Sequence, residues 1–197
     1  MALAGDMQPA ILSRTHLWKN IAAAAETRAM SPIIRPESPS EPAAIHAVTK
    51  AAFLHAPYTD HTEHHIVDAL RDAGALTISL VADEGGTIVG HVAVSPVSIS
   101  DGSVDWYGLG PISVHPEHQG RGVGSLLMRE ALRRLREQGA AGCVLLGEPA
   151  YYSRFGFRPE DGLVLPDVPP EYFQAVSFGP PVPRGVVTYH AAFGAQG

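Results

Sequence analysis

Apolar residues near the start of the chain recur at the spacing of amphipathic helices. A short strand is predicted at Ile33–Ile34. Ser40 follows as a candidate N-cap, and a helix is predicted behind it with an apolar face at Ile45, Val48 and Phe53. The next periodic stretch predicts a second helix from Thr62 to Ala73, which Gly74 ends.

The pattern then changes to apolar runs separated by tight glycine turns. The predicted strands are Ile78 to Ala82, Thr87 to Ile99 and Asp105 to Val114. Their connections, around Gly85-Gly86 and Asp101-Gly102, are short enough to join only antiparallel neighbours, so a meander is expected. The last of these strands contains Gly108, Gly110 and Pro111, which indicate a bulge or a close backbone approach.

The clearest amphipathic pattern covers Gly124 to Gln138, where leucines form one stripe and arginines lie on other faces. Behind it we predict a buried strand at Val144–Leu146 and a short helix from Pro149 to Phe155. Weak strands are predicted near Gly162–Leu165 and Gly185–Tyr189, and mostly loop from Pro166 to Pro183. This order of elements predicts an α/β protein with a mixed sheet.

Composition limits the classes of protein that this chain can belong to. The 197 residues are 45% hydrophobic and 17% charged, which suits one globular domain. We expect that domain to cover residues 31–197. Residues 1–30 carry Arg and Lys but no continuous apolar segment, and we expect a flexible or helical extension, with an organelle transit peptide as the alternative.

Charge and cysteine content exclude several partners. A net charge of −6 argues against a nucleic-acid surface, and the sequence has no apolar run long enough for a membrane span. The only cysteine, Cys143, excludes an internal disulfide and a cysteine-rich zinc site. It is expected to be inert core and agrees with a cytoplasmic location. The oligomeric state stays open, with a homodimer among the alternatives.

A glycine-rich turn, Gln119-Gly120-Arg121-Gly122-Val123-Gly124, joins a predicted strand to the long helix. Such a turn leaves backbone N–H groups free at the positive end of a helix, so it predicts an anion site, to which Ser125 can add a hydroxyl. No Gly-Lys-Ser/Thr follows, which excludes a P-loop. The preceding antiparallel strands exclude a dinucleotide-binding βαβ unit.

With its flanks Val114-His115-Pro116 and the amphipathic helix, this turn closely resembles the acetyl-CoA signature of the GNAT N-acyltransferase superfamily. The core Gln/Arg-x-x-Gly-x-Gly/Ala is matched by Gln119, Gly122 and Gly124. Downstream, the segment from Tyr151 to Phe157 is similar to the family's aromatic-Tyr-x-x-x-Gly-Phe segment. Together with Gly108–Pro111, the run Gly147-Glu148-Pro149 resembles the YhbS-type branch of predicted acetyltransferases.

The resemblance implies the GNAT fold, with a mostly antiparallel central sheet flanked by helices, and acetyl-CoA as cosubstrate without a metal. The pantetheine arm would lie along a strand and the pyrophosphate on the glycine turn. The residues implied in binding acetyl-CoA are Ile112, Ser113, Val114, Gln119, Gly120, Arg121, Gly122, Val123, Gly124 and Ser125.

Tyr152 occupies the position of the family's general acid, with Tyr151 as the adjacent rival. A tyrosine hydroxyl is protonated at neutral pH and can donate to a departing thiolate. The general base is less well defined, and Asp105 and Glu148 at predicted strand ends are the candidates. The Asn frequent in the family after the fifth strand is missing, because Gly147-Glu148-Pro149 stands there.

These residues predict an enzyme, an N-acetyltransferase that moves an acetyl group from acetyl-CoA to a primary amine by direct attack. The alternative is a non-catalytic acyl-CoA sensor or interaction module on the same fold. The acceptor stays open among small amines, peptide N-termini and protein lysines. Acceptor-side candidates are His55, Tyr58, Asp60, His61, His64 and His65, of which His61 and His65 also have metal-ligand spacing on a helix, although no metal is expected.

Overall fold

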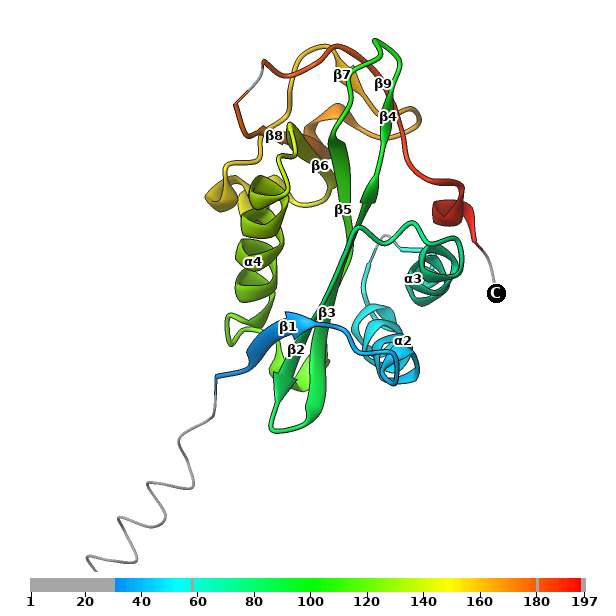
Figure 1. Cartoon of the computed structure of the whole chain (residues 1–197), viewed down its shortest axis with the longest axis vertical. Coiled ribbons are helices and arrows are strands. Elements are labelled where there is room, and N and C mark those ends of the chain that lie inside the picture. The colour runs from blue at the N-terminus through cyan, green and yellow to red at the C-terminus, as the bar shows by residue number, and fades with distance from the viewer. Residues whose placement is uncertain (1–30, 58, 180, 196–197) are drawn as a thin grey trace, which may run out of the picture. The chain divides into compact units, whose positions relative to one another are not determined.

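The computed structural model describes residues 31–57, 59–179 and 181–195, so the extension expected at residues 1–30 lies outside the described residues. Within the described part, six strands form a central sheet in the order β1-β2-β3-β5-β6-β8 (Figure 1). Their bounds are β1 Ile33–Pro36, β2 Ile78–Glu84, β3 Thr87–Pro96, β5 Trp106–Val114, β6 Gly142–Leu146 and β8 Phe173–Ser177.

Neighbouring strands of this sheet run antiparallel except β5 and β6, which are parallel. The meander predicted from the two glycine turns is confirmed as β2-β3-β5. A parallel pair needs a crossover connection, and the long helix α4, Val123–Glu137, supplies it. The predicted mixed, mostly antiparallel sheet is therefore confirmed.

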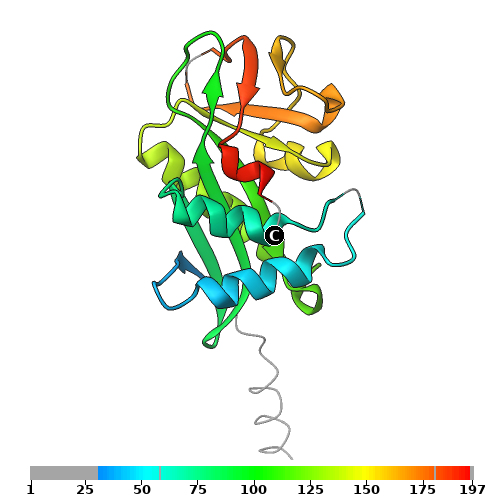
Figure 2. The ribbon, with the colours of Figure 1, turned by 90° about the vertical axis from the view of Figure 1, so that its right-hand side faces the viewer.

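Helices cover both faces of the sheet (Figures 1 and 2). On one face, Leu127, Met128 and Leu135 of α4 are fully buried in the cluster that also holds Leu80 and Val92 of the sheet. On the other lie α2, Pro42–Phe53, and α3, Glu63–Asp72. Within the described residues, no helix is long and apolar enough to cross a membrane.

The predicted N-cap of α2 is wrong. The helix is preceded by Glu41 in the cap position, and Ser40 Oγ instead lies 3.0 Å from Ser38 Oγ. The Glu41 carboxylate accepts hydrogen bonds from Arg35 and from the Ser38 amide, so neither side chain caps the helix.

The long strand predicted from Thr87 to Ile99 is also wrong as a single element. β3 ends at Pro96, which has no N–H to donate to a continuing ladder. Among the described residues, Ser98–Ile99 forms β4 of a separate sheet with the order β4-β9-β7. The other strands of that sheet are β7 Leu163–Val164 and β9 Gly185–Thr188, near the predicted weak strands.

The stretch from Pro166 to Pro183, which the sequence predicts to be mostly loop, also contains a strand that the prediction does not include. This strand is β8, which pairs with β6 along the full length of both strands. Phe173, Gln174 and Ala175 of this strand are buried. Because the strand is short and has prolines on both sides, the sequence pattern does not predict it. The remaining short elements are α5 Pro149–Tyr152, η1 Pro116–His118, η2 Ser153–Phe155, η3 Pro170–Tyr172 and η4 Ala191–Gly194.

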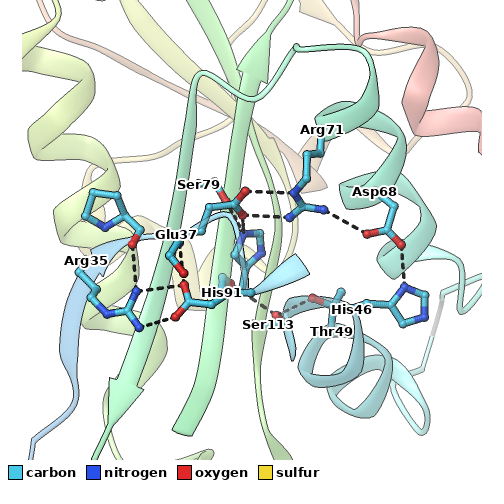
Figure 3. A network of polar contacts seen from close by, with 12 residues as sticks. Arg35, Glu37, His46, Thr49, Asp68, Arg71, Ser79, His91 and Ser113 are labelled. Atoms are coloured by element: carbon cyan, nitrogen blue, oxygen red, sulfur yellow. Dashed lines mark hydrogen bonds and ion pairs between the residues drawn. The ribbon is translucent and has the colours of Figure 1, made fainter. Parts of the chain in front are cut away.

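The face of the sheet under α2 and α3 contains a chain of polar side chains (Figure 3). Arg71 of α3 donates to both carboxylate oxygens of Glu37, at 3.0 and 2.9 Å. Ser79 Oγ lies 2.5 Å from Glu37 Oε2 and 2.8 Å from Nε2 of the fully buried His91. These directional bonds fix α3 and the segment after β1 against β2 and β3.

Candidate functional site

The two central strands β5 and β6 separate along their length. They pair only where Trp106–Gly108 faces Gly142–Val144. Beyond Gly108, β5 bulges: Val94 pairs with Leu109 and Val92 with Ile112, so Gly110 and Pro111 together face a single residue of β3. The predicted bulge is therefore confirmed, and from it onward β5 and β6 leave a gap between them.

A pocket of about 640 Å³ lies where the strands have separated. Its walls come from the end of β5, the glycine turn, the first turn of α4 and the segment around α5. The lining residues are Ile112, Val114, His118, Gln119, Gly120, Gly122, Val123, Gly124, Ser125, Gly147, Glu148, Tyr151, Tyr152 and Arg154.

The glycine turn gives the pocket an anion-binding end. Gly122 is the N-cap of α4 with φ +85°, a left-handed conformation that favours glycine. The first bond of the helix runs from the Leu126 amide to the Gly122 carbonyl, at 3.1 Å. The amides of Val123, Gly124 and Ser125 precede that bond, so they are free to bind a negatively charged group at the positive helix end.

Two further side chains extend this end of the pocket. A Cβ atom on Gly124 would lie 2.9 Å from the Tyr151 hydroxyl, so that hydroxyl lies over the start of α4. The guanidinium carbon of Arg154 lies 4.0 Å from the centre of the Tyr151 ring. Arg154 was not singled out in the sequence, where nothing except its aromatic neighbours distinguishes it from other exposed arginines.

Tyr152 lines the same pocket and also packs against the apolar cluster between α4 and the sheet. A Cβ on Gly147 would be only 2.3 Å from Cε2 of the Tyr152 ring, so glycine there lets the ring lie against the backbone of the β6–α5 connection. Burial raises the pKa of Tyr152 to about 12. Its hydroxyl therefore keeps its proton at neutral pH and can act as a donor.

The two candidate bases lie in different places. Glu148 occupies the N-cap position of α5 and lines the pocket. Asp105 lies outside it, in a second hollow of about 380 Å³ between Pro96 and Tyr107, with φ +61°. The geometry therefore brings Glu148, and not Asp105, together with Tyr152.

Of the residues implied in binding acetyl-CoA, Ser113 and Arg121 do not line the pocket. Ser113 is buried on the opposite face of β5, where its Oγ lies 3.2 Å from Thr49 Oγ1 of α2 (Figure 3). Arg121 points outward and forms a 3.0 Å ion pair with Glu84. His118, which the sequence did not indicate, lines the pocket and lies 2.9 Å from Glu84.

The histidines do not form the helical pair that their spacing suggested. His61 precedes α3, has φ +59°, and its Nδ1 lies 2.7 Å from the Phe53 carbonyl. The rings of His46, His64 and His65 pack against one another, and burial lowers the pKa of His64. Among the described residues, no three His, Cys, Asp or Glu side chains are grouped to hold a metal. Tyr58 lies outside the described residues.

Cys143 is fully buried in the cluster between α4 and the sheet. Burial raises the pKa of its thiol, which keeps the sulfur protonated and poorly nucleophilic. This agrees with the predicted role as inert core.

The profile of a family described as "Acetyltransferase (GNAT) domain" matches residues 34–159. The N-acetyltransferase YhbS of Escherichia coli is 39% identical over 127 residues, which cover 64% of this chain and 73% of YhbS. The N-acetyltransferase YjhQ of the same species is 36% identical over 98 residues, or 48% of this chain and 54% of YjhQ.

Solved structures agree with this assignment. A GNAT family acetyltransferase from Brucella melitensis in complex with acetyl-CoA has 52% sequence identity and a TM-score of 0.74, covering 82% of this chain and 97% of that one. YhbS from Escherichia coli in complex with CoA has 34% identity and a TM-score of 0.76, covering 86% of this chain and 95% of the other.

Proposed function

This chain belongs to the GNAT acetyltransferase family, and we propose that it transfers the acetyl group of acetyl-CoA to a primary amine by direct attack. The observation that carries the proposal is the pocket between the separated strands β5 and β6. Its lining includes the first turn of α4, whose amides are free, and Tyr152, whose hydroxyl is protonated at neutral pH. Residues 31–197 form the acetyltransferase domain in this proposal.

The pocket suits the parts of acetyl-CoA in order. The pyrophosphate would bind the amides of the glycine turn and Ser125, with Arg154 beside them. The pantetheine arm would lie along the open edge of β5 at Ile112 and Val114, as an added strand does. The Val114 carbonyl already accepts a hydrogen bond from Gln119 Nε2 at 3.0 Å, which holds the glycine turn against β5.

In the proposed reaction the amine nitrogen attacks the thioester carbon, and a C–N bond forms as the C–S bond breaks. Glu148 takes the proton that the amine loses. Tyr152 gives its proton to the departing CoA thiolate, so the products are the amide and CoA, and a proton passes back from Glu148 through solvent. The net charge of −6 favours the approach of cationic amines.

The cosubstrate site is tested by calorimetry with acetyl-CoA on the wild type and on a Gly122→Glu, Gly124→Glu double variant. Two carboxylates at the amides would repel the pyrophosphate and fill its place. We expect at least a hundredfold loss of affinity in the double variant. Equal affinity in both proteins, or no binding by a folded wild type, would contradict the site.

The role of Tyr152 is tested with Tyr152→Phe in an amine screen that measures CoA release. We expect turnover to fall by about 10²–10⁴-fold because the thiolate loses its proton donor, with the affinity for acetyl-CoA little changed. Tyr172→Phe, at an exposed tyrosine outside the pocket, is the control. A Tyr152→Phe variant as active as the wild type would remove the assigned role, and acetyl-CoA binding without turnover of any amine would favour a non-catalytic sensor.

A further inference from the structure

Two buried hydroxyl groups lie at the closed end of the gap between β5 and β6. Within the described residues, Ser95 Oγ and the Tyr189 hydroxyl are both buried and have no hydrogen-bond partner. A buried hydroxyl without a partner costs about 1–3 kcal/mol, so each such group calls for an explanation, such as a catalytic role or a bound water or ion.

The two side chains meet at one glycine. Ser95 of β3 is the direct partner of Gly108 of β5, and side chains of paired residues lie on the same face of a sheet. A Cβ on Gly108 would lie 2.3 Å from Cε1 of Tyr189, so the Tyr189 ring covers Gly108 on that same face. A side chain at position 108 would clash with the Tyr189 ring, so this position requires glycine.

This face is the one covered by α3. Ala93, two residues before Ser95 on β3, packs in the cluster with Ile45 of α2 and Val67 of α3. The Tyr189 ring lies 4.6 Å from that of Phe193, which packs against α3, and Figure 2 shows the C-terminal segment beside this helix. The hydroxyls thus lie on the side of the sheet opposite α4.

Gly108 also forms the last pair between β5 and β6. On β5 the pocket is lined by Ile112 and Val114, and Gly108 lies farther along the strand, beyond this lining. In the arrangement proposed below, the thioester continues along β5 from these residues and brings its carbonyl oxygen to Gly108–Leu109. Farther along β5, Pro111 of the bulge has no N–H to donate into the gap. The hydroxyls of Ser95 and Tyr189 supply donors at Gly108–Leu109.

We propose that Ser95 and Tyr189 form a side-chain oxyanion hole that binds the carbonyl oxygen of the acetyl thioester. This inference rests on the proposed function. When the amine nitrogen adds to the thioester carbon, the C=O electron pair moves onto oxygen, and both hydroxyls donate to that oxyanion. The pair returns as the C–S bond breaks, and the thiolate takes its proton from Tyr152.

The test needs no acceptor. Acetyl-CoA labelled with ¹³C at the carbonyl is bound to the wild type, Tyr189→Phe, Ser95→Ala and the double variant, and its carbonyl stretch is recorded by infrared difference spectroscopy. Hydrogen bonds lower this frequency, so we expect the band to move to higher frequency with each substitution and furthest in the double variant. Tyr172→Phe, at an exposed tyrosine, is the control and should leave the band unchanged.

Calorimetry with acetyl-CoA and with CoA gives the second measurement. Each substitution should weaken acetyl-CoA binding about threefold to tenfold while CoA binding stays unchanged. Because the hydroxyls have no partner among the residues that the structure describes, Tyr189→Phe should not lower the free energy of unfolding. An unchanged carbonyl band in a folded double variant that binds acetyl-CoA would overturn this inference alone. A wild type that binds no acetyl-CoA would overturn the proposed function and this inference with it.

Discussion

The two faces of the central sheet are held by different forces. Against α4 the contact is apolar, with Leu127, Met128 and Leu135 fully buried on the sheet. Under α2 and α3 the apolar cluster is smaller, and buried His91 lies beside it with Ser79, Glu37 and Arg71 (Figure 3). Apolar contact contributes free energy in proportion to area, whereas hydrogen bonds also fix direction. We infer that the α4 face supplies most of the stability and the other face sets the positions of α2 and α3.

The largest loss of stability is expected from a substitution in the apolar contact between α4 and the sheet. Leu127→Ala should lower the free energy of unfolding by about 2–5 kcal/mol, because it leaves a cavity between α4 and the sheet. Space there is tight, since a Cβ on Gly90 would lie 3.1 Å from Leu127 Cδ1. Urea denaturation measures the change. Leu126→Ala, at the adjacent and exposed leucine, should cost less than about 1 kcal/mol, and equal losses in the two variants would contradict the comparison.

A smaller effect is expected when the polar face is broken. Glu37→Gln removes the charge that Arg71 pairs with and reduces the acceptors for Arg71 and Ser79. We expect a loss of about 1–3 kcal/mol, because the half-buried donors Arg71 and Ser79 lose acceptor atoms. Glu137→Gln breaks an exposed ion pair with Arg133 on α4 and should cost at most about 0.5 kcal/mol. A larger loss from Glu137→Gln than from Glu37→Gln would reverse this ranking.

The smallest effect is a dependence on pH that only the polar face should show. Burial lowers the pKa of His91 to about 3, from an ordinary value of 6.5. Below pH 6.5 His91 is therefore protonated in the unfolded chain but stays neutral in the folded chain. The free energy of unfolding is greatest above pH 6.5 and falls as the pH is lowered. From pH 6.5 to 5.5 the loss is on the order of 1 kcal/mol for one such group.

Unfolding free energies at pH 7.5, 6.5 and 5.5 measure this slope. His91→Gln should flatten it, although His64, whose pKa is also lowered by burial, keeps part of it. Identical slopes in the wild type and His91→Gln would exclude His91 as the source.

The sequence predicts those features of the fold that depend on residues close together along the chain. The leucine stripe of α4, the glycine turn and the β2-β3-β5 meander each depend on residues close in sequence. Hidden features depend on partners far along the chain. β8 becomes a strand because β6 offers a partner edge, and the place of Tyr189 follows from its contact with Gly108. The face of the sheet on which Ser113 lies also depends on the bulge at Gly110–Pro111. The sequence pattern indicates this bulge, but it does not tell to which face the residues after the bulge point.

The early separation of β5 and β6 gives this sheet two edges in its interior as well as those at its rims. Exposed strand edges invite pairing with other chains, which is why proteins usually shorten, charge or cover them. Here the glycine turn and the segment around α5 flank the inner edges, so the opening admits a thin, flexible chain more readily than a second sheet. An unpaired strand edge at the rim of a sheet would promote aggregation. In the interior of this sheet, the unpaired edges of β5 and β6 instead favour ligands thin enough to fit between the two strands.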